Sequence, residues 1–287
     1  MQRSRSQCTL VSSAVLGKAV AVAQLLRSDI LSSDPPILRH IAPSSACADL
    51  AIRVADAIAS LRLEHLPRYY ASWRAKADGG SPARTEAEQN LIRDHLETGF
   101  RTDSTRILKG LVAENLLYFV CIAGAIDLAP VYARRPKLDP TDHGADGFVV
   151  YETGHALHSF RLWECKATDT SDLAGSAAEA CSQLAEEGGR YLASLVQDVP
   201  QTGHAGAAAL VVSAPELWAN RAEQAGAGAV VVGRTADAAT AVSGTLGSWR
   251  RHLAWMKGAQ QFRALLAGLD EVDGFALAVK EQLWKGL

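Results

Sequence analysis

HGADGFVVYETGHALHSFRLWECKATD, residues 143–169, contains two runs rich in β-branched and aromatic residues, separated by a short turn-like segment. The runs are GFVVY, residues 147–151, and ALHSFRLWECK, residues 156–166, and the turn is ETGH, residues 152–155. Two such runs on either side of a glycine-containing turn predict an antiparallel β-hairpin.

Three charged residues fall at one end of this hairpin. Alternate residues of a strand share a face, so Glu164 and Lys166 are expected on one side, and Trp163 and Cys165 on the other. Asp146 begins the partner strand, and a fold-back near residue 154 brings it close to Glu164. Two carboxylates and an ammonium at one end of a sheet are a place for a divalent cation.

This pattern resembles the motif of the PD-(D/E)xK nuclease superfamily, which has the restriction-endonuclease-like fold. Asp146, which opens one strand, and the triplet Glu164, Cys165 and Lys166 on the next carry the similarity. The chain has no strict Pro-Asp pair, because Pro140 lies six residues before Asp146. Many members of the superfamily lack this pair too.

The flanking segments follow the order of that fold over roughly residues 104–200. Upstream, KGLVAENLLYFV, residues 109–120, looks like its first helix, and Glu114 stands where members such as the Holliday-junction resolvases carry a glutamate. Downstream, residues 171–197 form a long helical stretch.

The resemblance implies a Mg²⁺ or Mn²⁺ site and phosphodiester hydrolysis. Asp146, Glu164, the main-chain carbonyl of Cys165 and Glu114 would hold the metal, and Lys166 would orient or activate the attacking water. Such a cation neutralises the transition state, supplies hydroxide near neutral pH and stabilises the leaving oxygen. The competing interpretation is an edge strand whose acid and lysine form an ordinary solvated face. Charged residues within so apolar a run are costly unless they are paired or bound to metal, which favours the site.

Other polar residues near the hairpin carry weaker signals. His143, His155 and His158 lack the spacing of a zinc site and are interpreted as structural or exposed. Gln183 and Tyr191 lie on one face of the downstream helix and are similar to the glutamine and tyrosine of the RecB-type branch, although their spacing differs.

Two further segments have specific interpretations. The basic residues Arg134, Arg135 and Lys137 precede Asp146 and are expected either to contact phosphates or simply to keep a loop soluble. Gly226 and Gly228 precede a predicted strand, whereas a dinucleotide-binding fingerprint follows one, so a Rossmann fold is excluded.

The composition limits the class of protein that this chain can be. With 287 residues, 48% of them hydrophobic, the chain can bury a full core. A net charge of −2 gives no overall basic surface, so nucleic-acid contacts must come from local patches or a partner. The five cysteines, without any CxxC, indicate reduced thiols. Arg3 and Arg5 precede a mildly apolar run, but Lys18 interrupts it, and the sequence favours a cytoplasmic protein without a membrane span.

The remaining elements are predicted from hydrophobic periodicity and from the positions of proline and glycine. Residues 9–31 are interpreted as a helix or as a strand that runs into a helix, with the helix favoured. A helix is expected over residues 49–66 with Asp49 as its N-cap, and a short strand over 128–132. Pro35, Pro36 and Pro43 indicate a loop, and residues 76–85 a linker. Runs near 208–214 and 227–234 are expected to be buried strands, and helices are expected near 236–267 and 271–285.

Together these features predict an α/β chain with a restriction-endonuclease-like mixed β-sheet flanked by helices and an N-terminal helical region. Residues 1–100 form that region and residues 101–287 the catalytic domain. The expected function is metal-dependent DNA cleavage, beside a helicase, ATPase or other recognition subunit in a restriction or anti-phage defence system, with a homo-oligomer also compatible. The alternatives are a non-catalytic binding or scaffolding subunit with a degenerate nuclease fold, and a nuclease that acts on RNA.

Overall fold

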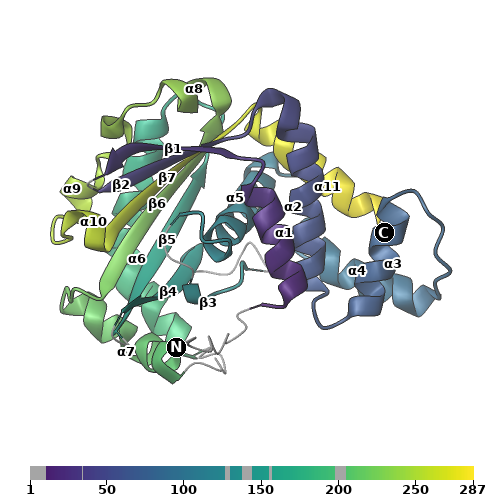
Figure 1. The fold of residues 1–287 in the computed structure, drawn as a ribbon, viewed down its shortest axis with the longest axis horizontal. Helices are drawn as coiled ribbons and strands as arrows, with labels where there is room; N and C mark the ends of the chain where they lie inside the picture. Colours follow the sequence, from purple (N-terminus) through teal and green to yellow (C-terminus); the bar gives the residue numbers. More distant parts are fainter. Residues whose placement is uncertain (1–10, 34, 127–129, 138–143, 155–156, 198–204) are drawn as a thin grey trace, which may run out of the picture.

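The computed structural model of the chain describes residues 11–33, 35–126, 130–137, 144–154, 157–197 and 205–287. At its centre is a seven-stranded sheet with the order β1-β2-β7-β6-β5-β4-β3 (Figure 1). Its strands are β1 (Arg27–Ser33), β2 (Pro36–Ile41), β3 (Pro130–Ala133), β4 (Gly147–Gly154), β5 (Leu157–Ala167), β6 (Ala225–Arg234) and β7 (Phe262–Leu269).

The sheet is mixed. The four central strands β2, β7, β6 and β5 run parallel to one another, and β1, β4 and β3 are antiparallel to their neighbours. This arrangement confirms the expected class, an α/β chain with a mixed sheet flanked by helices.

The helices cover both faces of the sheet (Figure 1). They are α1 (Ser13–Ala23), α2 (Cys47–Arg62), α3 (Pro67–Ala77), α4 (Glu86–Glu97), α5 (Thr105–Ile122), α6 (Leu173–Gln197), α7 (Ala205–Ala219), α8 (Thr235–Thr240), α9 (Trp249–His252), α10 (Gly258–Gln261) and α11 (Val272–Lys285), with 3-10 turns η1 (Ser44–Ala46) and η2 (Ser243–Leu246). Helices α1, α2, α5 and α11 share one core with the sheet, and α6, α7 and α9 share the other.

Strand β5 contributes alternately to these two cores. Trp163 and Cys165 face the core that contains α5, whereas Phe160 and Leu162 face the core that contains α6. The close packing of Trp163 explains the glycine of β6 opposite it, because a Cβ atom on Gly228 would lie 2.1 Å from Cε3 of Trp163. The two faces of β5 therefore differ in partners, as the alternation predicts.

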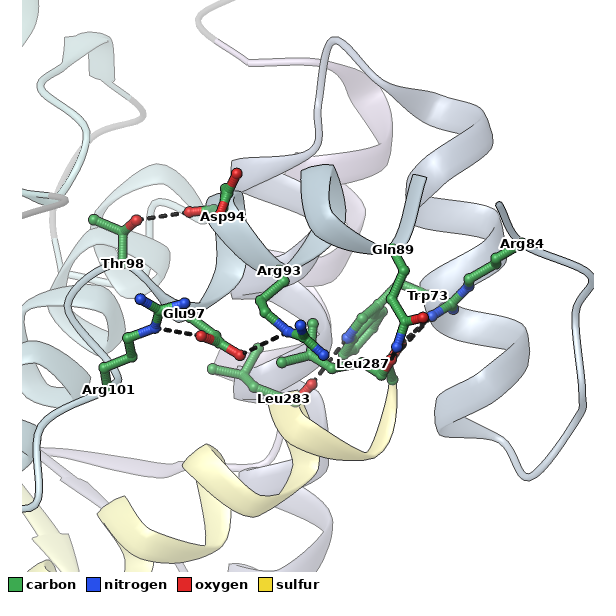
Figure 2. A network of polar contacts seen from close by, with 11 residues as sticks. Trp73, Arg84, Gln89, Arg93, Asp94, Glu97, Thr98, Arg101, Leu283 and Leu287 are labelled. Atoms are coloured by element: carbon green, nitrogen blue, oxygen red, sulfur yellow. Dashed lines mark hydrogen bonds and ion pairs between the residues drawn. The ribbon is translucent and has the colours of Figure 1, made fainter. Parts of the chain in front are cut away.

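Helices α3 and α4 lie beyond the sheet and hold the C-terminal end of α11 (Figure 1). Figure 2 shows the polar contacts of this junction. The indole of Trp73 donates to the carbonyl of Leu283 at 3.0 Å, and Arg84 donates to the carbonyl of Gly286 at 2.9 Å. On α4, Glu97 pairs with both Arg93 and Arg101. These contacts tie the predicted N-terminal region to residues of the C-terminal helix.

Many of the expected elements are confirmed. The hairpin of β4 and β5, the helices α5, α6 and α11 and the strand β6 lie where the sequence predicts them, and β3 overlaps the expected strand over 128–132. Helix α3 includes residues 76 and 77, and residues 78–85 connect it to α4; that this segment links two domains stays a prediction. Among the helices of the described residues, none is long and apolar enough to cross a membrane.

The predictions for the first 50 residues need correction. The stretch 9–31 is not one helix, because β1 follows α1 after a short turn, and Pro36 begins strand β2 rather than lying in a loop. Strand β1 is a polar edge strand, which produces no apolar pattern to detect. Helix α2 is confirmed, but Ala46 is its N-cap and Asp49 lies in its first turn, where a negative charge complements the helix dipole.

Two predictions in the last third of the chain are wrong. The run near 208–214 is not a strand but part of α7, where Val211 is buried and its neighbour Val212 is 55% exposed, as on an amphipathic helix. The helix expected over 236–267 is replaced by short helical turns and by β7. The alanine and leucine residues of β7 favour a helix, but burial between two parallel strands decides its structure. Gly226 and Gly228 lie within β6 rather than before it.

Candidate active site

The hairpin brings Asp146 and Glu164 to the same end of two paired strands. Gly147 pairs with Trp163, so the next residue on each strand, Asp146 and Glu164, lies just beyond the last pair. The Oδ2 atom of Asp146 accepts a hydrogen bond from the main-chain N–H of Cys165 at 2.8 Å. This bond fixes the Asp146 carboxylate beside the middle residue of the ExK triplet.

Lys166 lies on the face of β5 that is covered by α6. Its ammonium donates to Oε1 of Gln183 at 2.6 Å, and it lies 3.1 Å from Oε1 of Glu179 and 3.4 Å from Oε1 of Glu164. Gln183 in turn donates to the hydroxyl of Tyr191 at 2.8 Å. The two helix residues singled out by their similarity to the RecB-type branch thus form a chain of hydrogen bonds that ends at Lys166.

Helix α5 brings Glu114 to the other face of the hairpin. Ser104 caps this helix by accepting from the N–H of Ile107, and an almost continuous buried surface packs α5 against the sheet. The carboxyl groups of Glu114 and Asp146 are close enough to share a hydrogen bond, and both lie within electrostatic reach of Cys165. Glu114 therefore lies beside the acids rather than on the solvent face of its helix.

The acidic side chains of the candidate site repel one another and are largely buried. Burial, followed by the negative charge of Asp146, raises the pKa of Glu164 to about 9. The same two causes raise the pKa of Glu114 to about 8. Burial disfavours the ammonium of Lys166, but Glu164 and Glu179 outweigh that effect and raise its pKa. Both carboxyls therefore favour the protonated form more strongly than ordinary glutamates do, and a divalent cation would displace such protons on binding.

The main-chain carbonyl of Cys165 is placed as a further oxygen donor. The N–H and C=O of one strand residue point to the same side of the strand, and the N–H of Cys165 points to Asp146. Burial, with the charges of Asp146 and Glu114, keeps the pKa of the Cys165 thiol well above its ordinary value. The thiol is therefore neutral, and the carbonyl is the donor that this residue can offer.

The donor set fits a hard divalent cation. Glu114 and Glu164 each present a buried carboxyl oxygen, Oε2, that has no hydrogen-bond partner among the described residues. Carboxylates and a carbonyl are the ligands that Mg²⁺ and Mn²⁺ prefer. Within the described part of the chain, no three acidic, histidine or cysteine side chains are already drawn together as a complete ligand set.

The basic loop before Asp146 makes contacts that its composition does not reveal. Lys137 donates to the carbonyl of Gly144 at 2.7 Å and to Oδ1 of Asp146 at 3.3 Å. Arg135 forms an ion pair with Glu64 at the end of α2. The expectation that Arg134, Arg135 and Lys137 contact phosphates stays a prediction, and two of the three already have acidic partners.

A second group of residues, which the sequence analysis missed, supports the end of β5. Asp169 accepts from Lys109 of α5 at 2.7 Å and from the main-chain N–H of Val272 at 3.0 Å. It thereby joins the segment after β5 to α5 and to the start of α11. No periodicity or motif marks Lys109 and Asp169 as partners. Of the three histidines, His158 is half-buried on β5, and His143 and His155 lie outside the described residues.

No protein-family model matches the chain, and a search of curated proteins finds no significant match. What the protein does is therefore inferred from its own residues.

Proposed function

We propose that this protein is a metal-dependent endonuclease that hydrolyses DNA phosphodiester bonds, with a restriction-endonuclease-like catalytic domain of the PD-(D/E)xK type. The observation that carries the proposal is the convergence of Glu114, Asp146, Glu164 and Lys166 at one end of the β4–β5 hairpin, from three separate elements. The order of those three elements and of the helix that follows them, α5, β4, β5 and then α6, is the order that the resemblance implies.

Asp146, Glu164, Glu114 and the Cys165 carbonyl would hold Mg²⁺ or Mn²⁺. The cation supplies charge neutralisation at the phosphate and a water of lowered pKa. Lys166 is held by Gln183 and Glu179, so its ammonium is oriented before substrate arrives and can donate a hydrogen bond to the attacking water.

The wider setting is also a proposal. A chain with a net charge of −2 has little overall attraction for DNA, so a helicase, ATPase or other recognition subunit would bring it to its substrate. A restriction or anti-phage defence system in the cytoplasm is such a setting, and a homo-oligomer would also enlarge the binding surface.

The test is divalent-dependent nicking of supercoiled plasmid DNA by the purified protein, with single-stranded RNA as a parallel substrate. We expect Asp146→Ala and Lys166→Ala to lower the nicking rate at least about 100-fold while circular dichroism stays unchanged. Asp146→Asn keeps an acceptor for the Cys165 N–H and guards against a misfolded alanine variant. Glu216→Ala, which removes an exposed carboxylate on α7, is the matched control.

Full activity in either Asp146→Asn or Lys166→Ala would refute the assignment. DNA binding without cleavage in the wild-type protein would favour the non-catalytic scaffolding alternative. Cleavage of RNA but not of DNA would change the proposed substrate from DNA to RNA and leave the assigned active-site residues unchanged.

A further inference from the structure

Lys137 is almost buried at the acid cluster. Its side chain is 10% exposed, and that of Asp146 is 11% exposed. The ammonium is bound by one carboxylate oxygen and one main-chain carbonyl, from Asp146 and Gly144. A carboxylate and a carbonyl are also the kind of ligands that would surround a divalent cation at this place.

Both carboxylate oxygens of Asp146 already have a partner. Its Oδ2 atom accepts from the Cys165 N–H, and its Oδ1 atom faces Lys137. The positive charge of Lys137 also reaches Glu114 and Glu164, where it opposes the rise in pKa of both. Lys137 is thus the cation in contact with Asp146, and its charge also reaches Glu114 and Glu164, while Lys166 contacts Glu164, Glu179 and Gln183 on the α6 face.

We propose that the Lys137 ammonium is the resident counter-ion of this site, and that a divalent cation binds by displacing it from Asp146. This inference rests on the proposed function, because it concerns the same metal. It also separates Lys137 from the phosphate-contacting role expected of the basic loop, since an ammonium that is bound by Asp146 and Gly144 and nearly excluded from solvent does not face a nucleic acid.

Lys137 competes with a metal for one oxygen of Asp146. While its ammonium holds Oδ1, that oxygen is directed to Lys137. Release of Lys137 frees the oxygen for the metal. The ammonium, on a flexible four-carbon chain, then becomes available at the mouth of the site.

The experiment is calorimetric titration of Mn²⁺ into the full-length protein without DNA, so that the readout is affinity and not activity. Lys137→Met removes the competing charge, and Lys137→Gln removes it while keeping a donor for the Gly144 carbonyl. A charge-assisted hydrogen bond of this kind must be broken in the wild-type protein, so both variants are expected to bind Mn²⁺ at least about tenfold more tightly.

Arg134→Met is the matched control. Arg134 precedes Lys137 in the same loop and acts on Glu114 through its charge. If the loss of any nearby positive charge were enough, Arg134→Met would tighten Mn²⁺ binding as much as the Lys137 variants do. If displacement of Lys137 is responsible, Arg134→Met changes the affinity for Mn²⁺ less than about threefold.

Thermal unfolding of the metal-free proteins gives an independent reading. Loss of Lys137 leaves Asp146 without its counter-ion, so the melting temperature of Lys137→Gln is expected to fall without Mn²⁺ and to recover when Mn²⁺ is saturating.

The results distinguish the two levels of inference. Saturable binding by the wild-type protein with unchanged or weaker binding by Lys137→Met and Lys137→Gln would overturn the displacement and leave the nuclease proposal standing. An equal gain in Arg134→Met would overturn it in the same way. Absence of Mn²⁺ binding in all variants would overturn the metal site itself.

Discussion

Replacing Glu164 by glutamine is expected to stabilise the metal-free protein while removing its activity. The Glu164 side chain is 3% exposed, and one of its oxygens has no hydrogen-bond partner among the described residues. Burial and the charge of Asp146 raise its pKa to about 9, so the folded protein disfavours the ionised form. Glutamine has nearly the same shape and carries no charge.

The size of the effect follows from linkage. In the unfolded chain Glu164 ionises at its ordinary pKa of 4.5, while the folded protein keeps it protonated up to about 9. At pH 7.5 the gap of three pH units corresponds to at most about 4 kcal/mol, at about 1.4 kcal/mol per unit. The contact with Lys166 is already included in the folded pKa, but glutamine places an N–H donor without an assigned acceptor in this buried site, which offsets roughly 2 kcal/mol. The net gain is therefore about 1 to 2 kcal/mol, or roughly 2 to 4 °C in melting temperature.

The assay is thermal unfolding at pH 7.5 in the presence of a chelator, followed by the same measurement with excess Mg²⁺. We expect Glu164→Gln to melt above the wild-type protein with chelator and to gain nothing from Mg²⁺. Glu179→Gln is a close control, because Glu179 contacts the same ammonium at 3.1 Å but its side chain is 69% exposed. Its free energy of unfolding is expected to change by less than about 0.5 kcal/mol.

A lower melting temperature for Glu164→Gln in chelator would contradict this reasoning, because it would mean that the buried carboxylate is already well satisfied. An equal gain in Glu179→Gln would show that total charge, and not burial, is responsible.

Two further predictions concern pH and packing. The folded pKa values of Glu164 and Glu114, about 9 and about 8, lie above the unfolded value of 4.5, so the stability they contribute is present below pH 4.5 and is lost as pH rises toward those values. Between pH 7 and 9 the metal-free melting temperature should therefore fall and the stabilisation by Mg²⁺ should grow. The buried His40 does not contribute in this range, because its ordinary pKa of 6.5 lies below it. A melting temperature that does not change with pH in scanning fluorimetry would count against both pKa shifts. Gly228→Ala should cost about 1 to 3 kcal/mol in urea unfolding, because the new Cβ meets the Trp163 ring, whereas Gly110→Ala, with open space at its Cβ and a helical backbone, should not destabilise the protein.

The part of the fold that carries the candidate site was accessible from the sequence because its signals are local. Alternating apolar residues and a glycine-containing turn specify the β4–β5 hairpin, and long apolar stretches specify α5 and α6. The proximity of Asp146 and Glu164 follows from the register of that hairpin. Glu114 could be placed only through the resemblance, because nothing in the spacing of a helix says which strand it will meet.

The errors fall where distant residues decide the structure. Strand β7 has the composition of a helix and is a strand because β2 and β6 flank it. Helix α7 contains a β-branched pair that resembles a strand when read alone. The contact between Lys137 and Asp146 depends on how a loop without periodicity returns to the sheet, so composition identified the charge of Lys137 but not its partner.

The position of β2 in the sheet has a consequence for how the chain reaches this structure. Ile37 lies opposite Ala264, so one of the four central parallel strands is synthesised long before its partner β7. At about 5 to 20 residues per second, the β1–β2 hairpin waits for roughly 10 to 45 s on the ribosome before its partner emerges. During that interval the β7-facing edge of β2 offers unpaired backbone groups to other chains. Folding of this protein is expected to be slow and to benefit from chaperones that bind the early hairpin.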